Sequence, residues 1–330
     1  MTEMQGEVSS RSSVSGPNRL RGVRGRVNRA VRDATPGRVR RVVEAADYRR
    51  RKLASRNPRT FTEKIVYKML RDHRPLLTTF SDKIAVRDYV ATKVGAEFLP
   101  GLHAVVEDPR DLVLKELPRE FVVKAAHSSG GVVVVTDGAP AGEELPELGS
   151  GWTHSTVRRE NLDRDRLVRL CDSWLAGEYG GGPFHEWSYV HVPRRILVEE
   201  FLRDERGAIP ADFKFFVFHA KCRLVQVDTG RYGEHRQNFF TPAWNPVAVE
   251  LVAPPASVPP PRPATLELMI DVAERLAVDT DFVRVDLYEI GSRVVFGELT
   301  SFPQGGKYSF HPASFEAEMG SWWNPPSVYR

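Results

Sequence analysis

Charged and apolar side chains alternate in two neighbouring segments near the C-terminus of the sequence. The first reads Arg284-Val-Asp286-Leu-Tyr288, and the second reads Gly297-Glu298-Leu-Thr300. Two carboxylates at the ends of short apolar runs favour a site for a hard cation, and Mg²⁺ prefers one or two carboxylates together with phosphate oxygens. These residues therefore indicate a protein that handles a nucleoside triphosphate.

The two segments are predicted to form a hairpin whose turn decides whether the carboxylates meet. Side chains two residues apart in a strand share a face. Asp286 and Glu298 share a face only if the turn has an odd number of residues, so we expect the three-residue turn Ile290-Gly291-Ser292 with Gly291 left-handed. A two-residue turn would place the carboxylates on opposite faces. The alternative is a surface hairpin with solvated charges.

A lysine and a glycine-rich loop form a second candidate site. Lys124 ends a predicted strand and is followed by His127-Ser128-Ser129-Gly130-Gly131. Backbone amides and hydroxyls in such a loop can lie over a polyphosphate, with the lysine as a point charge. An ordinary Ser/Gly hairpin turn explains the pattern equally well.

Three further segments could contact a nucleotide or a substrate. Lys214 lies in a very apolar strand and needs an anion, which can be phosphate or the nearby Asp212. An acidic-apolar segment of the kind that lines adenine pockets reads Val198-Glu199-Glu200-Phe201-Leu202. Gly305 and Gly306 follow the second carboxylate strand, where their amides could bind a substrate carboxylate or simply form a turn.

These residues must be positioned by a mixture of helices and strands. Helices are predicted over 62–72, capped by Thr60 or Thr62, over 82–93, capped by Ser81, and over 266–277, capped by Thr265. Hairpins are predicted over 121–136 and over 212–228 with a turn at His219-Ala220, and a strand over 194–202. Residues 137–190 are expected to be largely helical, and the proline-rich stretch 251–263 to be an extended connector.

The composition indicates a globular chain with a basic N-terminal arm. The chain has 330 residues and a net charge of +4. Residues 1–60 hold 15 arginines and one lysine against five acidic residues, a net +11 that leaves −7 for the rest. The first 18 residues are expected to be disordered. Residues 19–57 could contact nucleic acid or an anionic membrane, although a docking arm folded against the body is favoured.

The sequence also bears on the compartment. It contains no apolar run long enough to span a bilayer, and its N-terminus does not resemble a signal peptide. Cys171 and Cys222 lack metal or redox spacing and are interpreted as buried thiols in a reducing cytoplasm. The oligomeric state is not indicated by any pattern.

Taken in order, these segments resemble the ATP-grasp superfamily and, more narrowly, its TupA-like branch, named for a teichuronopeptide biosynthesis protein. The matching pieces extend over about residues 61–320 and leave only the basic arm uncovered. They are Thr62-Glu63-Lys64, Ser81-Asp82-Lys83 with Arg87, the segment 121–131, Val198–Leu202, Asp212–Phe215, Arg284–Tyr288 and Phe296–Thr300.

The resemblance implies an α+β ATP-grasp fold in which two α+β lobes clamp ATP behind a reduced N-terminal α/β lobe. We expect the basic arm at 1–60 and the reduced preATP-grasp lobe at 61–120. The first ATP-grasp lobe, with the phosphate loop and hinge, is expected at 121–202, and the second, with the metal and substrate site, at 203–330.

The resemblance also implies roles for the candidate residues. Lys83 and Lys124 would bind phosphates or the adenine edge, and Lys214 would hold phosphate. The loop from Ser128 to Gly131 would close over the triphosphate, and His127 beside it would also contact ATP. Glu199, Glu200, Phe201 and Leu202 would form the adenine hinge. Asp286 and Glu298 would hold one or two Mg²⁺ ions. The wider superfamily often has asparagine where this chain has Thr300, which puts the second ion in doubt.

The implied reaction is ATP-dependent ligation of a small carboxylate to an amine through an acyl phosphate. Arg284 would lie beside the reacting carboxylate with Lys214, and Gly305 and Gly306 would contact the substrate. Natural-product or cell-surface polymer biosynthesis is the implied setting. The alternatives are a nucleotide-binding scaffold protein docked by its arm and a phosphotransferase on the same fold.

Overall fold

The computed structural model describes residues 46, 49–147, 152–180, 186–230 and 234–330. The chain divides into two units, Met1–Arg50 and Arg51–Arg330, and the description below concerns the second. Residues 49–54 are helical, whereas the predictions for residues 1–18 and for most of 19–57 lie outside the described residues. Of the helices in the described ranges, none combines the length and apolar character of a membrane span.

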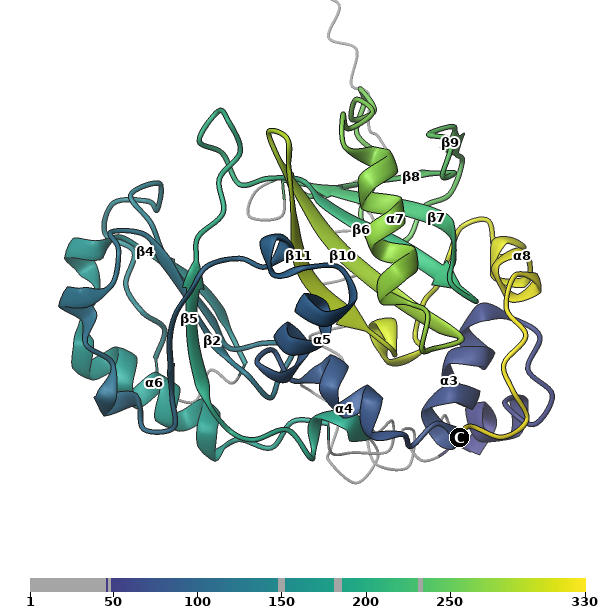
Figure 1. Cartoon of the computed structure of the whole chain (residues 1–330), viewed down its shortest axis with the longest axis horizontal. Coiled ribbons are helices and arrows are strands. Elements are labelled where there is room, and N and C mark those ends of the chain that lie inside the picture. Colours follow the sequence, from purple (N-terminus) through teal and green to yellow (C-terminus); the bar gives the residue numbers. More distant parts are fainter. Residues whose placement is uncertain (1–45, 47–48, 148–151, 181–185, 231–233) are drawn as a thin grey trace, which may run out of the picture. The chain divides into compact units, whose positions relative to one another are not determined.

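A five-stranded sheet, here called sheet A, has the order β1-β5-β2-β3-β4 (Figure 1). All neighbours pair antiparallel except β3 and β4, which are parallel. Its buried face packs against helix α6 (Arg164–Ala176) through residues such as Phe121, Val133 and Trp174. The strands are β1 (Leu102–Val106), β2 (Phe121–Ala125), β3 (Val132–Val135), β4 (His154–Val157) and β5 (Ile196–Glu200).

The sequence predicted part of sheet A. The hairpin over 121–136 and the strand within 194–202 are confirmed as β2, β3 and β5. The prediction of a largely helical stretch over 137–190 is wrong, because the helical elements in its described residues are α6 and two short 3₁₀ turns, and β4 joins the sheet edge. β4 was missed because its residues, His-Ser-Thr-Val, carry no apolar alternation, and strand pairing supplies what the local pattern lacks.

A six-stranded antiparallel sheet, here called sheet B, has the order β11-β10-β6-β7-β8-β9. Helix α7 (Leu266–Leu276) packs through residues such as Met269 and Leu276 onto its apolar face, which includes Phe215 and Val285 (Figure 1). The strands are β6 (Asp212–Phe218), β7 (Lys221–Thr229), β8 (Arg236–Phe240), β9 (Pro246–Val247), β10 (Phe282–Ile290) and β11 (Arg293–Thr300).

The predicted hairpin over 212–228 is confirmed as β6 and β7. His219 and Ala220 form its turn with φ of 49° and 56°, the left-handed backbone of the tight turns that match strand twist. Residues 251–263 contain no helix or strand, as predicted. Thr265 precedes α7 as expected but does not cap it, because its hydroxyl donates to Glu289 at 2.7 Å.

The N-terminal helices support both sheets. Helix α3 (Phe61–Arg71) begins with a capping box between Thr60 and Glu63, and Phe61 packs against aromatic side chains of sheet B and of the C-terminal segment. The remaining helices are α4 (Pro75–Ser81), α5 (Ala85–Lys93) and α8 (Phe315–Ser321), with 3₁₀ turns at Ala96–Phe98, Pro109–Asp111, Leu114–Glu116, Arg159–Asn161, Trp187–Tyr189 and Pro303–Gly305.

The predicted cap at Ser81 is wrong. Ser81 is the last residue of α4, and its hydroxyl donates to the carbonyl of Leu77 at 3.0 Å. Pro75 starts this helix because its fixed φ suits the first helical turn, and the next helix begins only at Ala85. The sequence prediction merged the end of one helix and the start of the next.

Candidate active site

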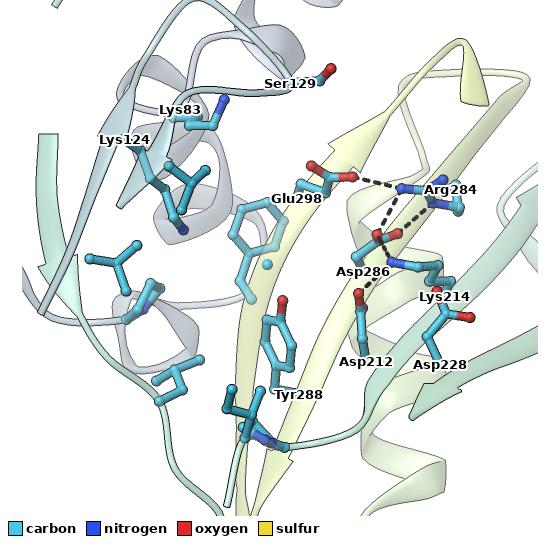
Figure 2. Close-up of a pocket in the computed structure, with 18 of the residues that line it drawn as sticks. Lys83, Lys124, Ser129, Asp212, Lys214, Asp228, Arg284, Asp286, Tyr288 and Glu298 are labelled. Atoms are coloured by element: carbon cyan, nitrogen blue, oxygen red, sulfur yellow. Dashed lines mark hydrogen bonds and ion pairs between the residues drawn. The ribbon is translucent and has the colours of Figure 1, made fainter. Parts of the chain in front are cut away.

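One cavity of about 410 Å³ is lined by residues of both sheets, a size typical of small-ligand sites. Sheet A contributes an apolar wall bordered by Lys124 and by Lys83, which lies between α4 and α5, and sheet B contributes a charged wall (Figure 2). Most of the residues that the sequence singled out line this cavity: Lys83, Lys124, Ser129, Glu199, Glu200, Phe201, Leu202, Lys214, Arg284, Asp286 and Glu298.

The hairpin β10–β11 brings the two carboxylates together by a route that differs from the prediction. Ile290 pairs with Arg293, so the turn has two residues rather than three. A β-bulge lies between Asp286 and Leu287, where Gly297 of the facing strand is the extra residue, and Asp286 therefore pairs with Glu298. A two-residue turn alone would place the two carboxylates on opposite faces of the sheet. The extra residue in the bulge shifts the register by one, so both carboxylates lie on the same face.

Gly297 is well suited to this bulge. A Cβ atom at its position would lie 3.0 Å from the carbonyl oxygen of Asp286 and 3.0 Å from the ring of Tyr288. A larger residue would push the strands apart where the carboxylates meet. The left-handed conformation expected for Gly291 is confirmed, with φ of 58°.

Arg284 joins the two carboxylates. Its Nε donates to Asp286 Oδ1 at 2.7 Å, and one terminal nitrogen donates to Asp286 Oδ2 at 2.8 Å and to Glu298 Oε1 at 2.6 Å (Figure 2). The same nitrogen donates to the hydroxyl of Thr300 at 3.0 Å, and that hydroxyl donates to Glu298 at 3.0 Å. The guanidinium thus holds both candidate metal ligands in one hydrogen-bonded cluster.

Lys214 extends this cluster to the next strand. Its ammonium lies 2.5 Å from Asp212 Oδ2 and 2.6 Å from Asp286 Oδ2. Burial acts to lower the pKa of Lys214, but the two aspartates outweigh it and raise the pKa above its ordinary value. Lys214 is therefore a fixed positive charge, and Asp212 is the structural partner that the sequence suggested as an alternative to phosphate.

The two candidate metal carboxylates differ in their surroundings. Asp286 is buried, with 3% of its side chain exposed, whereas 49% of the Glu298 side chain is exposed. Burial raises the pKa of Asp286, and the charges of Arg284 and Lys214 oppose this rise. Burial acts in the same direction on Glu298, but Arg284, Lys214 and Lys83 lower its pKa to about 2. Glu298 is thus an anion at neutral pH.

The two carboxylates fit a magnesium ion whose remaining coordination positions are filled by phosphate oxygens. Asp286 and Glu298 face each other across paired strands and both contact the same guanidinium nitrogen. Within the described ranges, no group of three or more histidine, cysteine or acidic residues is arranged to hold a metal. Two carboxylates without a full protein cage suit Mg²⁺, which keeps water and phosphate oxygens among its ligands.

The sheet A wall is apolar. Val122, Val132 and Val134 form a cluster on the cavity face of β2 and β3, and Phe201 packs against it. Arg203 lies over the Phe201 ring at 5.0 Å from its centroid. The predicted hinge thus borders an apolar surface, as adenine recognition requires.

Charged residues border this apolar surface. Lys124 forms an ion pair with Glu199, whose second oxygen lies 3.9 Å from Arg87. Glu200 accepts a hydrogen bond of 2.8 Å from the amide of Gly101 and pairs with Arg293. Both hinge carboxylates are therefore fixed by neighbouring groups.

The glycine-rich loop is held by contacts to side chains around it. Lys83 donates to the carbonyl of Ser128, and the Ser129 hydroxyl is hydrogen-bonded to Tyr179. Gly131 has φ of 70°, which favours glycine. Burial lowers the pKa of Lys83 to about 8, so its charge changes near physiological pH.

Several predicted residues do not line the cavity. His127 is buried and its Nε2 is 3.1 Å from the carbonyl of Trp174, and Gly130 lies against Trp152. Gly306 accepts a hydrogen bond of 2.6 Å from Arg51, and Gly305 lies near Glu186. Ser128, Gly131 and Thr300 are likewise absent from the lining, although Thr300 contacts Arg284.

The residues of this region that the sequence analysis missed include Glu186 and four polar residues of the cavity lining. Burial and the nearby Glu298 raise the pKa of Glu186 to about 7. The alternation of polar and apolar residues in β7 could have revealed two of the others, whereas β8 and the segment after β11 gave no signal. These four line the cavity: Gln226, Asp228, Gln237 and Tyr308.

Comparisons with known proteins give one family model and several solved structures that this chain is similar to. Residues 184–323 match the family model described as TupA-like ATPgrasp, and no curated protein matches the chain. Among solved structures, D-alanine–D-alanine ligase from Bacillus anthracis has 15% identity and a TM-score of 0.39, over 74% of this chain and 64% of its own. The ATP-grasp ligase PsnB complexed with its minimal precursor has 10% identity and a TM-score of 0.37, over 69% and 54%.

A third solved structure, N5-carboxyaminoimidazole ribonucleotide synthetase from Thermus thermophilus, has 12% identity and a TM-score of 0.36, over 68% and 45%. This chain thus spans about half to two thirds of the length of these proteins. The family match covers β5 to α8 and, with them, the charged wall of the cavity. The family predicted from the ordered motifs is thus confirmed for residues 184–323, which match the model.

Proposed function

We propose that this protein is an ATP-dependent ligase that joins a carboxylate to an amine. The observation that carries the proposal is the pairing of Asp286 with Glu298, both hydrogen-bonded to Arg284, in a cavity whose opposite wall is apolar. The apolar wall of sheet A suits the nucleobase, and the charged wall of sheet B suits the charges of the triphosphate. We also propose the lobe boundaries at 120 and 202 and the ligand roles given above.

In the proposed reaction, an oxygen of the substrate carboxylate attacks the γ-phosphorus of ATP and ADP leaves. The amine then attacks the acyl carbon, loses a proton, and displaces phosphate to form an amide. Two anions must approach each other in the first step, so the positive charges of Arg284 and Lys214 lower its barrier. Mg²⁺, held by Asp286 and Glu298, would supply further charge neutralisation on the phosphates.

The setting is part of the proposal. Natural-product or cell-surface polymer assembly is inferred from the family. A cytoplasmic location is supported by Cys171 and Cys222, which are free and buried thiols, as expected in a reducing compartment.

The test is ADP release by the full chain with ATP, Mg²⁺ and a panel of carboxylates, with hydroxylamine as the amine. Hydroxylamine converts an acyl phosphate to a hydroxamate, so carboxylate-dependent ADP and hydroxamate in equal amounts are expected. A stable phosphorylated product without hydroxamate would instead identify a phosphotransferase. ATP binding without ADP release across the panel would identify a nucleotide-binding scaffold, and either outcome would refute the ligase.

A further inference from the structure

A second polar cluster lies on the charged wall, beyond Lys214 and away from the metal carboxylates. It consists of Gln226 and Asp228 on β7 and of His235, which precedes β8, and we call it the β7–β8 cluster. All three residues line the cavity. Gln226 and Asp228 are 3% and 5% exposed, so their polar atoms need partners within the protein or a ligand.

The orientation of Gln226 follows from its neighbour. Its Nε2 donates to Asp228 Oδ1 at 2.9 Å. Exchanging the amide oxygen and nitrogen would place two acceptors against each other, so Nε2 must face the carboxylate and Oε1 must point elsewhere. Oε1 is buried and has no hydrogen-bond partner in the described part of the chain. A buried acceptor left in this state destabilises the protein, and a donor-bearing ligand would remove that cost.

His235 and Asp228 also have polar atoms without close partners in the described part of the chain. The Nε2 atom of His235 lies 3.8 Å from Asp228 Oδ2, too far for a hydrogen bond, and it also has no hydrogen-bond partner among the described residues. No arginine or lysine of the described ranges lies within 4.0 Å of Asp228, in contrast to Asp212 and Asp286, which share Lys214. The cluster thus has a carboxylate and an amide oxygen that lack an arginine or lysine partner within the described ranges.

A ligand group that satisfies such a cluster carries a positive charge and several N–H donors. An alkylammonium group does so with three N–H donors, and charge-assisted hydrogen bonds to a carboxylate are the stronger kind. We propose that Gln226, Asp228 and His235 form a binding subsite for the ammonium group of a substrate. The assignment to a substrate rests on the ligase function proposed above.

The position of the cluster separates this ammonium from the reacting atoms. Gln226 is paired with Lys214, which is paired with Asp286 on the next strand. Two strand spacings place Gln226 about 10 Å from Asp286. The ammonium therefore serves recognition and is not the nitrogen that forms the amide. One of the two substrates accordingly carries an amine remote from its reacting group, as a basic side chain does.

The nucleotide is the competing explanation, because ribose hydroxyls also donate hydrogen bonds. The test uses the full chain with Mg²⁺ and a non-hydrolysable ATP analogue. Butylammonium and its neutral counterpart butanol are titrated and followed by ligand-observed NMR. We expect butylammonium to bind at least tenfold more tightly than butanol. Asp228→Asn should weaken butylammonium at least tenfold and leave the affinity for the ATP analogue within twofold.

Two outcomes would overturn the subsite. Butylammonium that binds the wild type no better than butanol, or equally well to Asp228→Asn, would remove the ammonium assignment. A tenfold loss of affinity for the ATP analogue in Asp228→Asn would assign the cluster to the nucleotide. Asp271→Asn, on the exposed face of α7, is the control and should change neither affinity.

Two further points keep the test decisive. If thermal unfolding shows that Asp228→Asn does not fold, Gln226→Leu, which removes the unpartnered oxygen, should weaken butylammonium at least threefold, and an unchanged affinity would refute the subsite. The titration involves no turnover, so it is independent of ADP release. Absent ADP release with intact butylammonium binding would refute the ligase and leave the subsite standing.

Discussion

The two walls of the cavity are built by different means. On sheet A, Val122, Val132 and Val134 present an apolar surface, and their neighbours on alternate positions pack into the core beneath. On sheet B, Lys214 and Arg284 are each bound to aspartate, and the same strands are apolar on their other face. One wall depends on strand periodicity alone, and the other depends on a network of buried charges.

The difference shows how one cavity can combine an apolar surface that accepts ligand groups loosely with a charged surface whose geometry is fixed. An apolar surface accepts a flat group without fixed hydrogen-bond geometry. Buried charges are stable only when each has its partner, since an unpaired one costs several kcal/mol. Substitutions on the sheet A wall should therefore affect affinity in small steps, and substitutions on the sheet B wall should affect turnover or folding in large ones.

The largest effect is expected for the two carboxylates. Asp286→Asn and Glu298→Gln should each lower the rate of ADP release about 10³-fold or more, because a metal ligand is lost. They should differ in stability: Asp286→Asn leaves Lys214 and Arg284 without their shared buried partner and should lower the free energy of unfolding by about 3–5 kcal/mol. Glu298 is half exposed, so Glu298→Gln should unfold close to the wild-type denaturant midpoint.

Steady-state ADP release and urea unfolding measure both parts of this prediction. Near-normal rates in both variants would remove the metal assignment. Equal stability in both variants would show that the charged wall does not depend on its buried ion pairs.

Arg284→Lys is expected to lower turnover about 100-fold, because one ammonium cannot bind Asp286, Glu298 and Thr300 in the planar arrangement that holds them now. Single-turnover kinetics check this directly. Lys214→Arg is the matched comparison, since it keeps a charge on the same wall. A wild-type rate in Arg284→Lys would show that charge alone, without the fork of donors, is sufficient.

The pH dependence of ATP binding tests the role of Lys83, which lies at the border of the apolar wall. The pKa of Lys83 is about 8, so its positive charge is present below that pH and is lost as the pH rises through it. Affinity for ATP should fall about tenfold between about pH 7 and pH 9. In Lys83→Arg, which stays charged, the fall should disappear. If ATP affinity falls equally with pH in both proteins, the pH dependence belongs to another group.

The smallest effect is expected on the sheet A wall. Val134→Thr places a hydroxyl in the apolar surface and should weaken ATP about fivefold, about 1 kcal/mol, with turnover at saturation unchanged. Val133→Thr is the matched control, because Val133 points into the core and is fully buried. It should lower the unfolding temperature without changing ATP affinity. A changed turnover rate in Val134→Thr would contradict the prediction that the sheet A wall affects affinity and not turnover.

Much of the fold could be predicted from local patterns. The helix capped by Thr60 has a strong local signal in its cap, and the strands around Lys124 and Lys214 have one in their runs of β-branched and aromatic residues. β4 and β8 were missed because their residues form strands only through pairing with neighbours. The boundary near Ser81 was misplaced because two short helices follow each other closely.

The sequence by itself indicated the charged residues that line the cavity, because carboxylates, arginine and lysine in apolar strands have few stable solutions other than mutual pairing or a ligand. The order of its motifs also predicted the family whose model residues 184–323 match. The tertiary structure alone decided that Asp286 and Glu298 meet. A two-residue turn would have separated them, and the bulge at Gly297 reverses that result, because one extra residue changes the parity of a strand.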